Sequence, residues 1–152
     1  MLTLANPSGS LTLGSSITQA LTIIDDDSAS LSIDDVTVAE DAGIATFTVT
    51  LNNSVQDGLS VDFASLDGSA IAGADYTATS GTLVFSGTAG ETQTIDVAIT
   101  DDLLPESDET FAVVLSAPTN GVELQRATGT GTIADNDAST GDQIFSSGFE
   151  GQ

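Results

Sequence analysis

The sequence predicts an all-β protein, an antiparallel immunoglobulin-like β-sandwich of about seven strands. Strand-forming Thr, Val, Ile and Phe are abundant in the chain. Apolar residues recur at every second position in several short segments, which is typical of half-buried strands. No segment has a sustained helical period. Short strands separated by turn signals favour a sandwich, and the absence of Cys and Trp excludes the disulfide and buried Trp of antibody domains.

The expected strands follow one another between residues 30 and 137. In the first, residues 31–38, the apolar residues change from odd to even positions, which predicts a bulge or kink. Asp57-Gly58 and Asp67-Gly68 are turn signals between later strands. Those later strands are expected at residues 46–51, 59–63, 83–85, 95–99, 111–115 and 122–124.

The aromatic residues are expected to pack in the core of this domain. Phe47, Phe63, Phe85 and Phe111 all fall on the apolar face of an expected strand. Tyr76 lies in a connection between strands. We expect its ring to pack against the domain with the hydroxyl group at the surface.

An internal repeat sets the expected domain boundaries. Pro7 recurs as Pro118, 111 residues later, and the acidic run beginning at Asp25 recurs at Asp135, 110 residues later. A period of this length corresponds to a whole sandwich domain. We therefore expect the chain to be the C-terminal piece of a longer tandem-repeat protein. Its expected parts are the last two strands of a truncated upstream repeat (1–27), one complete domain (28–137) and a flexible tail (138–152).

The composition excludes several classes of function. The chain has 23 acidic residues and one basic residue, Arg126, which argues against binding to nucleic acid or to an anionic membrane surface. No apolar stretch reaches the roughly 18 residues of a membrane span, so membrane insertion is not expected. The chain has no His, Cys or Lys, and we expect no enzyme activity. No signal peptide is visible, so a secreted role requires a longer parent chain or another export route.

The acidic residues gather at the ends of the alternating segments. Carboxylates that are brought together raise each other's pKa, and this chain has almost no basic residues to neutralise them. Hard divalent cations bind such oxygen ligands, and calcium accepts a looser geometry than magnesium. Zinc is disfavoured without His or Cys. The alternative is that these are solvated loops that keep the protein soluble. The clusters are 40–41, Asp75, 101–102, 106–109 and 135–137.

Several stretches of the chain together resemble the Calx-beta domain. They occur in the order and at the spacing of that family across about 108 residues. The resemblance implies an immunoglobulin-like sandwich that binds calcium ions at one distal rim. The matching stretches are Val-Ala-Glu-Asp-Ala-Gly (38–43), Asp-Gly-Ser-Ala-Ile-Ala-Gly-Ala-Asp-Tyr (67–76), Gly-Thr-Leu-Val-Phe (81–85), Ile-Thr-Asp-Asp (99–102), Glu-Ser-Asp-Glu-Thr-Phe (106–111) and Thr-Ile-Ala-Asp-Asn-Asp (132–137).

The resemblance also implies a set of calcium ligands. Leu103 and Asn136 stand where the strongest binders of the family have an acid, which implies a lower affinity or fewer ions. The implied ligands are Glu40, Asp75, Asp101, Asp102, the carbonyl of Leu104, Glu106, Glu109, Asp135 and Asp137.

The repeat and the resemblance together predict a calcium-binding structural or adhesion repeat of a secreted or cell-surface protein. Its expected partners are calcium ions and neighbouring Calx-beta repeats or another protein surface. Two alternatives remain open at this point. One is a calcium-responsive regulatory module, as in sodium–calcium exchangers, and the other is a metal-free spacer or protein-interaction domain.

Overall fold

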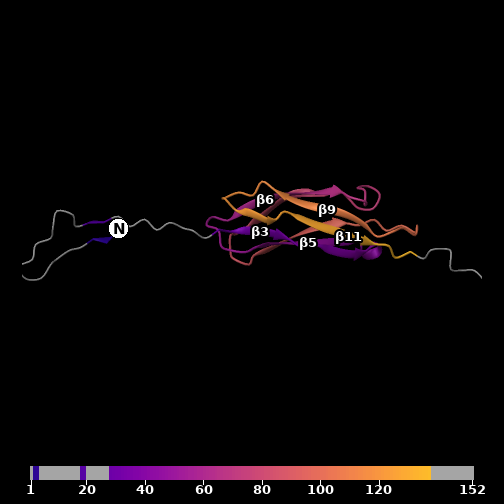
Figure 1. Cartoon of the computed structure of the whole chain (residues 1–152), viewed down its shortest axis with the longest axis horizontal. Helices are drawn as coiled ribbons and strands as arrows, with labels where there is room; N and C mark the ends of the chain where they lie inside the picture. Colours follow the sequence, from indigo (N-terminus) through magenta and orange to yellow (C-terminus); the bar gives the residue numbers. More distant parts are fainter. Residues whose placement is uncertain (1, 4–17, 20–27, 138–152) are drawn as a thin grey trace, which may run out of the picture.

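The computed structural model describes residues 2–3, 18–19 and 28–137, and the last of these ranges folds as a β-sandwich (Figure 1). The first sheet has four strands in the order β10-β3-β5-β8. In chain order these are β3 (Ser30–Ile33), β5 (Ile44–Leu51), β8 (Thr92–Ala98) and β10 (Glu123–Arg126).

The second sheet has five strands in the order β4-β11-β9-β6-β7. A single turn of 3-10 helix, η1 (Glu40–Ala42), follows its first strand. The strands are β4 (Val36–Ala39), β6 (Leu59–Asp67), β7 (Ser80–Phe85), β9 (Glu109–Ser116) and β11 (Thr128–Ala134). The predicted fold class is therefore confirmed.

Two strands pass from one sheet to the other, which accounts for the greater number of observed strands. The irregularity predicted in residues 31–38 is a break between β3 and β4, which lie in different sheets. The break is held by Asp34 Oδ1, which accepts the Thr48 N–H at 2.7 Å, and by Asp35 Oδ1, which accepts the Thr130 N–H at 2.7 Å. Strands β10 and β11 are divided in the same way. As a result, β10–β3 and β11–β4 are parallel pairs, and the remaining pairs of the sandwich are antiparallel.

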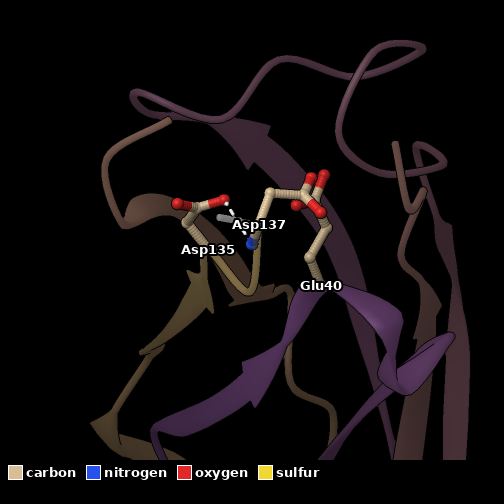
Figure 2. A group of neighbouring side chains, drawn as sticks. All are labelled: Glu40, Asp135 and Asp137. Atoms are coloured by element: carbon tan, nitrogen blue, oxygen red, sulfur yellow. Dashed lines mark hydrogen bonds between the residues drawn. The ribbon is translucent and has the colours of Figure 1, made fainter. Parts of the chain in front are cut away.

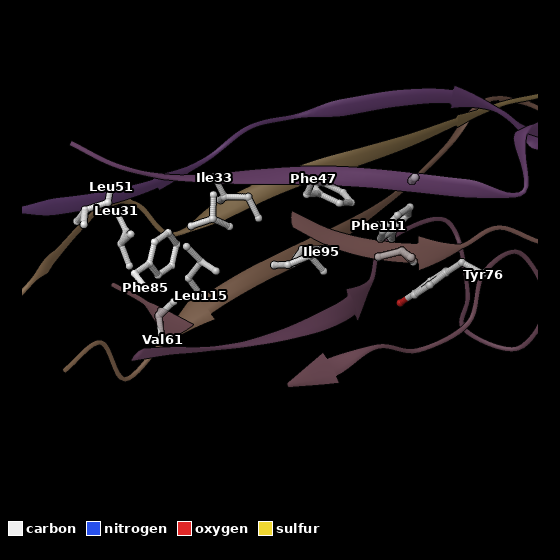
Figure 3. Close-up of a cluster of buried hydrophobic side chains, with 14 of the residues drawn as sticks. Leu31, Ile33, Phe47, Leu51, Val61, Tyr76, Phe85, Ile95, Phe111 and Leu115 are labelled. Carbon is white, nitrogen blue, oxygen red and sulfur yellow. The ribbon is translucent and has the colours of Figure 1, made fainter. Parts of the chain in front are cut away.

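The core lies between the sheets and contains three of the four expected phenylalanines (Figure 3). Phe47, Phe85 and Phe111 are fully buried, and Phe63 packs against the core while partly exposed. The prediction for Tyr76 was wrong in one respect. Its side chain is only 1% exposed, and its hydroxyl donates a hydrogen bond to Asp67 Oδ1 at 2.7 Å, so the hydroxyl does not point into solvent.

In the N-terminal part of the chain, the structure describes one short antiparallel pair of strands. Strand β1 (Leu2–Thr3) pairs with β2 (Thr18–Gln19). The remainder of the expected upstream fragment, and the C-terminal tail, lie outside the described residues. The division of the chain into residues 1–27, 28–137 and 138–152 stays a prediction. Within the described residues, no helix is long and apolar enough to span a bilayer.

Candidate metal centre

Strand register brings four separate segments to one end of the sandwich. Ala39 pairs with Ala134, so η1 and the end of β11 lie together. Glu109 pairs with Ile133, and Asp67 pairs with Phe111, so the β8–β9 and β6–β7 connections meet the same edge. We call this end the acid rim. It comprises Glu40, Asp75, Asp101, Asp102, Glu106, Glu109, Asp135 and Asp137.

The first cluster of the rim, the Glu40 group, consists of Glu40, Asp135 and Asp137. Each residue offers a carboxylate oxygen, and the three oxygens lie within 4.8 Å of one another. Glu40 is buried in η1, and Figure 2 shows its carboxylate turned toward that of Asp137. Asp135 Oδ1 accepts the N–H of Asp137 at 3.2 Å, which closes a turn after β11 (Figure 2).

The second cluster, the Asp75 group, consists of Asp75, Glu106 and Glu109. Their carboxylate oxygens also lie within 4.8 Å of one another. Asp75 Oδ2 accepts the N–H of Ile71 at 2.6 Å, which orients the carboxylate. Glu109 begins β9, whereas Glu106 belongs to the exposed connection before it.

The two groups share one small hollow. Its lining includes all of the Asp75 group and two members of the Glu40 group, together with Ser107 and Ile133. Five acids from four segments therefore border a single space. The chain has one basic residue, Arg126, and it is ion-paired with Asp35 at the β10–β11 break, so no basic side chain is left to neutralise the rim.

The electrostatics of the rim are those of unneutralised carboxylates. Burial, and then the charges of Asp102, Asp137 and Asp101, raise the pKa of Glu40 despite a hydrogen bond from the Asp102 backbone.

The pKa of Glu109 is raised by burial and then by Asp75, Glu106 and Glu40. The pKa of Asp137 is raised by burial and then by the charge of Asp135, with Asp101 and Asp102 adding to it. The rim therefore favours binding of positive charge, whether protons or a cation.

Three of the implied ligands are not members of either group. Asp101 and Asp102 lie in the exposed connection after β8, close enough to raise the pKa of Glu40 and Asp137. Asp102 Oδ1 accepts the N–H of Leu104 at 2.6 Å, forming a local turn. The side chain of Leu104 is exposed. Ligation by Asp101, Asp102 and the Leu104 carbonyl stays a prediction, as do the roles of the other six residues.

Sequence reasoning missed one acid that shapes the rim. Asp67 lies at the end of β6 and accepts hydrogen bonds from the Tyr76 hydroxyl and, at 2.9 Å, from the Ala72 N–H. These bonds lower the pKa of Asp67, so it stays charged without a metal. In the sequence, Asp67 was interpreted as part of a turn signal and of a stretch that resembles the Calx-beta domain, with no role of its own.

The residues of the rim fit a hard divalent cation. Every side chain of the rim offers a metal ion a carboxylate oxygen, the ligand type that calcium prefers. Asp137 Oδ2 is buried and accepts no hydrogen bond from the residues that the structure describes. A buried carboxylate oxygen without a partner is costly, and a bound cation removes that cost.

Comparison with known proteins identifies the family. Residues 16–137 match the Calx-beta domain. Sodium/calcium exchanger 1 from Canis lupus familiaris is 54% identical over 57 residues, which are 37% of this chain and 6% of the exchanger. The corresponding protein of Rattus norvegicus is 53% identical over 57 residues. The match therefore spans only a small part of these exchangers.

Solved structures agree with this assignment. The apo form of the Calx CBD1 domain has a TM-score of 0.68 at 27% identity, and the match covers 73% of this chain and all of that domain. The calcium binding domain CBD12 of CALX1.1 has a TM-score of 0.65 at 29% identity, covering 70% of this chain and 44% of that one. On the match over residues 16–137, with the same sandwich, this chain belongs to the Calx-beta family.

Proposed function

We propose that this domain binds calcium at the acid rim and acts as a non-catalytic, calcium-stabilised repeat. The observation that carries the proposal is that five carboxylates of the two groups line one hollow, while Asp137 Oδ2 is buried and accepts no hydrogen bond within the part of the chain that the structure describes. The relation to the calcium binding domain CBD12 of CALX1.1 supports the same ligand.

The residues of the rim would join four parts of the chain. Glu40 belongs to η1, Asp75 to the β6–β7 connection, Glu106 to the β8–β9 connection and Asp135 to the end of β11. Calcium supplies positive charge and takes six to eight oxygen ligands at about 2.3–2.6 Å. A calcium ion bound among these carboxylates would offset their mutual repulsion, because several of them would ligate the same ion.

A structural role follows from where the chain leaves the domain. Asp135 and Asp137 are the last acids before residue 138, so ligation there would fix the direction of the following segment. The repeat of this acidic run at 25–27, directly before the described domain, supports an array with short junctions between units. The location we propose for such an array is the cell surface or the extracellular space, with neighbouring repeats as partners.

The alternative is a calcium-responsive regulatory module, and the relation to sodium/calcium exchanger 1 favours it. Affinity separates the two roles. Extracellular modules bind calcium with dissociation constants of roughly 10⁻⁴–10⁻³ M, whereas intracellular sensors bind at roughly 10⁻⁷–10⁻⁵ M. A titration of the whole chain by isothermal calorimetry distinguishes these ranges.

Thermal unfolding in EDTA, in magnesium and in calcium tests the proposed binding. At a calcium concentration 100 times the dissociation constant, binding to the folded state adds about 2.7 kcal/mol to the free energy of unfolding. We expect that increment with calcium, little with magnesium, and none in the Glu106→Gln/Asp135→Asn variant.

The matched control is Asp62→Asn/Asp96→Asn. It also removes two charges, but from acids that hydrogen-bond Thr82 and Thr46 on the sheet surfaces. This variant should keep the calcium increment. Equal melting of the wild type in all three solutions would overturn the proposal and leave a metal-free spacer or interaction domain.

A further inference from the structure

The connection at residues 67–76 is tied to the core by Tyr76. The ring of Tyr76 stacks on Phe111 with centroids 4.5 Å apart and planes at 17°, and Phe111 meets Phe47 edge-on at 5.8 Å. The Tyr76 hydroxyl donates to Asp67 at 2.7 Å. Tyr76 is therefore anchored both by stacking and by a hydrogen bond, one residue after Asp75.

We propose that the Tyr76–Asp67 hydrogen bond positions Asp75 for calcium, so that Tyr76 sets the calcium affinity of the Asp75 group while leaving the Glu40 group unaffected. This inference rests on the proposed function and concerns how one of the two groups is organised. Neither Tyr76 nor Asp67 is a ligand in it. Both act through Asp75.

The backbone around Asp75 supports this role. Asp67 Oδ1 accepts the Ala72 N–H as well as the Tyr76 hydroxyl, so one oxygen holds both arms of the connection. The Gly73 N–H donates to the Tyr76 carbonyl at 2.8 Å, and the Asp75 N–H donates to the Ile71 carbonyl at 3.0 Å. The closed loop that results places the Ile71 N–H on Asp75 Oδ2.

The same loop is fastened to the strands that carry the neighbouring acids. The Thr100 N–H donates to the Asp75 carbonyl at 2.9 Å, next to the start of the β8–β9 connection. The Ala70 N–H donates to the Thr110 carbonyl at 3.0 Å, and the Thr110 N–H donates to Ser69 Oγ at 2.8 Å. Thr110 follows Glu109, so the loop sets the position of Asp75 relative to Glu109.

Among the described residues, no hydrogen bond joins the Glu40 group to Tyr76 or to its loop. Its members come from η1 and the end of β11, and their local hydrogen bond runs from Asp137 to Asp135. A loss of the Tyr76 hydroxyl should therefore weaken one group selectively. Residues that hydrogen-bond a metal ligand and orient it typically lower metal affinity by about 10–100-fold when they are removed.

Calcium titration of Tyr76→Phe by calorimetry tests the inference. Phe keeps the stacking on Phe111 and removes only the hydroxyl, and Asp67 is exposed to water, so the variant should fold. We expect the dissociation constant of the Asp75 group to rise about tenfold, at the lower end of that range. The double variant with Asp75→Asn should show no further loss of affinity, whereas the double variant with Glu40→Gln should still show the tenfold loss.

A merely structural role gives a different pattern. Phe85→Leu, in the core far from the rim, should lower the melting temperature in EDTA without changing calcium affinity. If Tyr76→Phe behaves like Phe85→Leu, or if its effect is the same in the Asp75→Asn and Glu40→Gln backgrounds, the inference is overturned. Absence of calcium binding by the wild type would overturn the proposed function and this inference together.

The chain provides its own optical probe for the test. It has one Tyr and no Trp, so tyrosine fluorescence comes from Tyr76 alone. In the wild type and in Glu40→Gln, calcium should change that fluorescence at the concentration that fills the Asp75 group. In Asp75→Asn the change should be lost, and an unchanged response there would contradict the assignment.

Discussion

Glu91, at one end of this sandwich, and the carboxylates of the acid rim, at the other, lie in contrasting environments. At the end away from the rim, Glu91 accepts hydrogen bonds from the Ser86 N–H at 2.9 Å, the Ser86 hydroxyl at 2.8 Å, the Gly87 N–H at 3.0 Å and the Thr88 N–H at 3.3 Å. The Ser86 N–H and the other donors lower the pKa of Glu91 to about 2. At the acid rim, the pKa of Glu40, Glu109 and Asp137 is raised.

The difference shows that the position of an acid at a strand end does not determine whether the protein stabilises its charge. The charge of Glu91 is stabilised by the protein itself, because its loop turns backbone N–H groups toward the carboxylate. Gly87 makes this possible with a φ of 92° and with close approach to the Val55 carbonyl, which leaves no room for a side chain. At the rim the carboxylates face one another. Positive charge to balance them must come from outside the chain.

The largest effect should follow removal of Glu91. Glu91→Ala leaves the N–H groups of residues 86–88 without their acceptor, so the melting temperature should fall by roughly 5 °C or more, the shift that follows loss of about one net hydrogen bond in a domain of this size. The fall should be equal in EDTA and in calcium, because this carboxylate is far from the rim. Thermal unfolding followed by circular dichroism measures both.

The result that would break the comparison is a calcium-dependent effect of Glu91→Ala. Glu91→Gln serves as the control, since it keeps an oxygen acceptor and the size of the side chain. It should lose less stability than Glu91→Ala. A loss confined to calcium solutions would mean that the two ends are coupled.

A smaller effect of opposite sign is expected at the rim. Asp137→Asn removes one charge from a cluster in which burial and neighbouring acids already disfavour the charged form. In EDTA the variant should melt slightly higher than the wild type, and its calcium increment should shrink. Asp62→Asn is the comparison for loss of a charge outside the rim. If Asp137→Asn melts lower in EDTA, repulsion does not govern the rim.

The strand positions could be predicted from period-two alternation, whereas the meeting of the acids at one rim was implied by the resemblance to the Calx-beta domain. Glu40, Asp75, Glu109 and Asp135 all follow or precede an alternating segment. The division of the first strand was also visible, as a change of parity in residues 31–38.

Asp67 and Glu91 were not among the acidic clusters found in the sequence, and their hydrogen-bonded roles were not predicted. Asp67 and Asp75 both lie in the same connection, yet Asp67 accepts a tyrosine hydroxyl and Asp75 faces Glu109. That distinction depends on tertiary neighbours, because hydrogen bonds from Tyr76 and backbone N–H groups form only once the loop is folded. The burial of the Tyr76 hydroxyl was mispredicted for the same reason.

The smallest and most general prediction concerns pH. The raised pKa of Glu40 and Glu109 means that the folded state binds protons more tightly than the unfolded state, where the ordinary value is 4.5. Their contribution to stability is full below that value and is lost as pH rises through the raised pKa. Without calcium, the free energy of unfolding should therefore increase as pH falls from neutral toward 4.5.

Glu91 limits this gain at lower pH. Its pKa of about 2 in the folded state lies below the ordinary 4.5, so its contribution is full above 4.5 and is lost as pH falls toward 2. The stability curve in EDTA should therefore pass through a maximum between these ranges. With calcium present, protons compete with the ion for the rim, so the gain in stability on lowering the pH from neutral should disappear or reverse. Denaturant unfolding across pH in both solutions measures this, and identical curves with and without calcium would mean that the rim acids and the ion do not share a site.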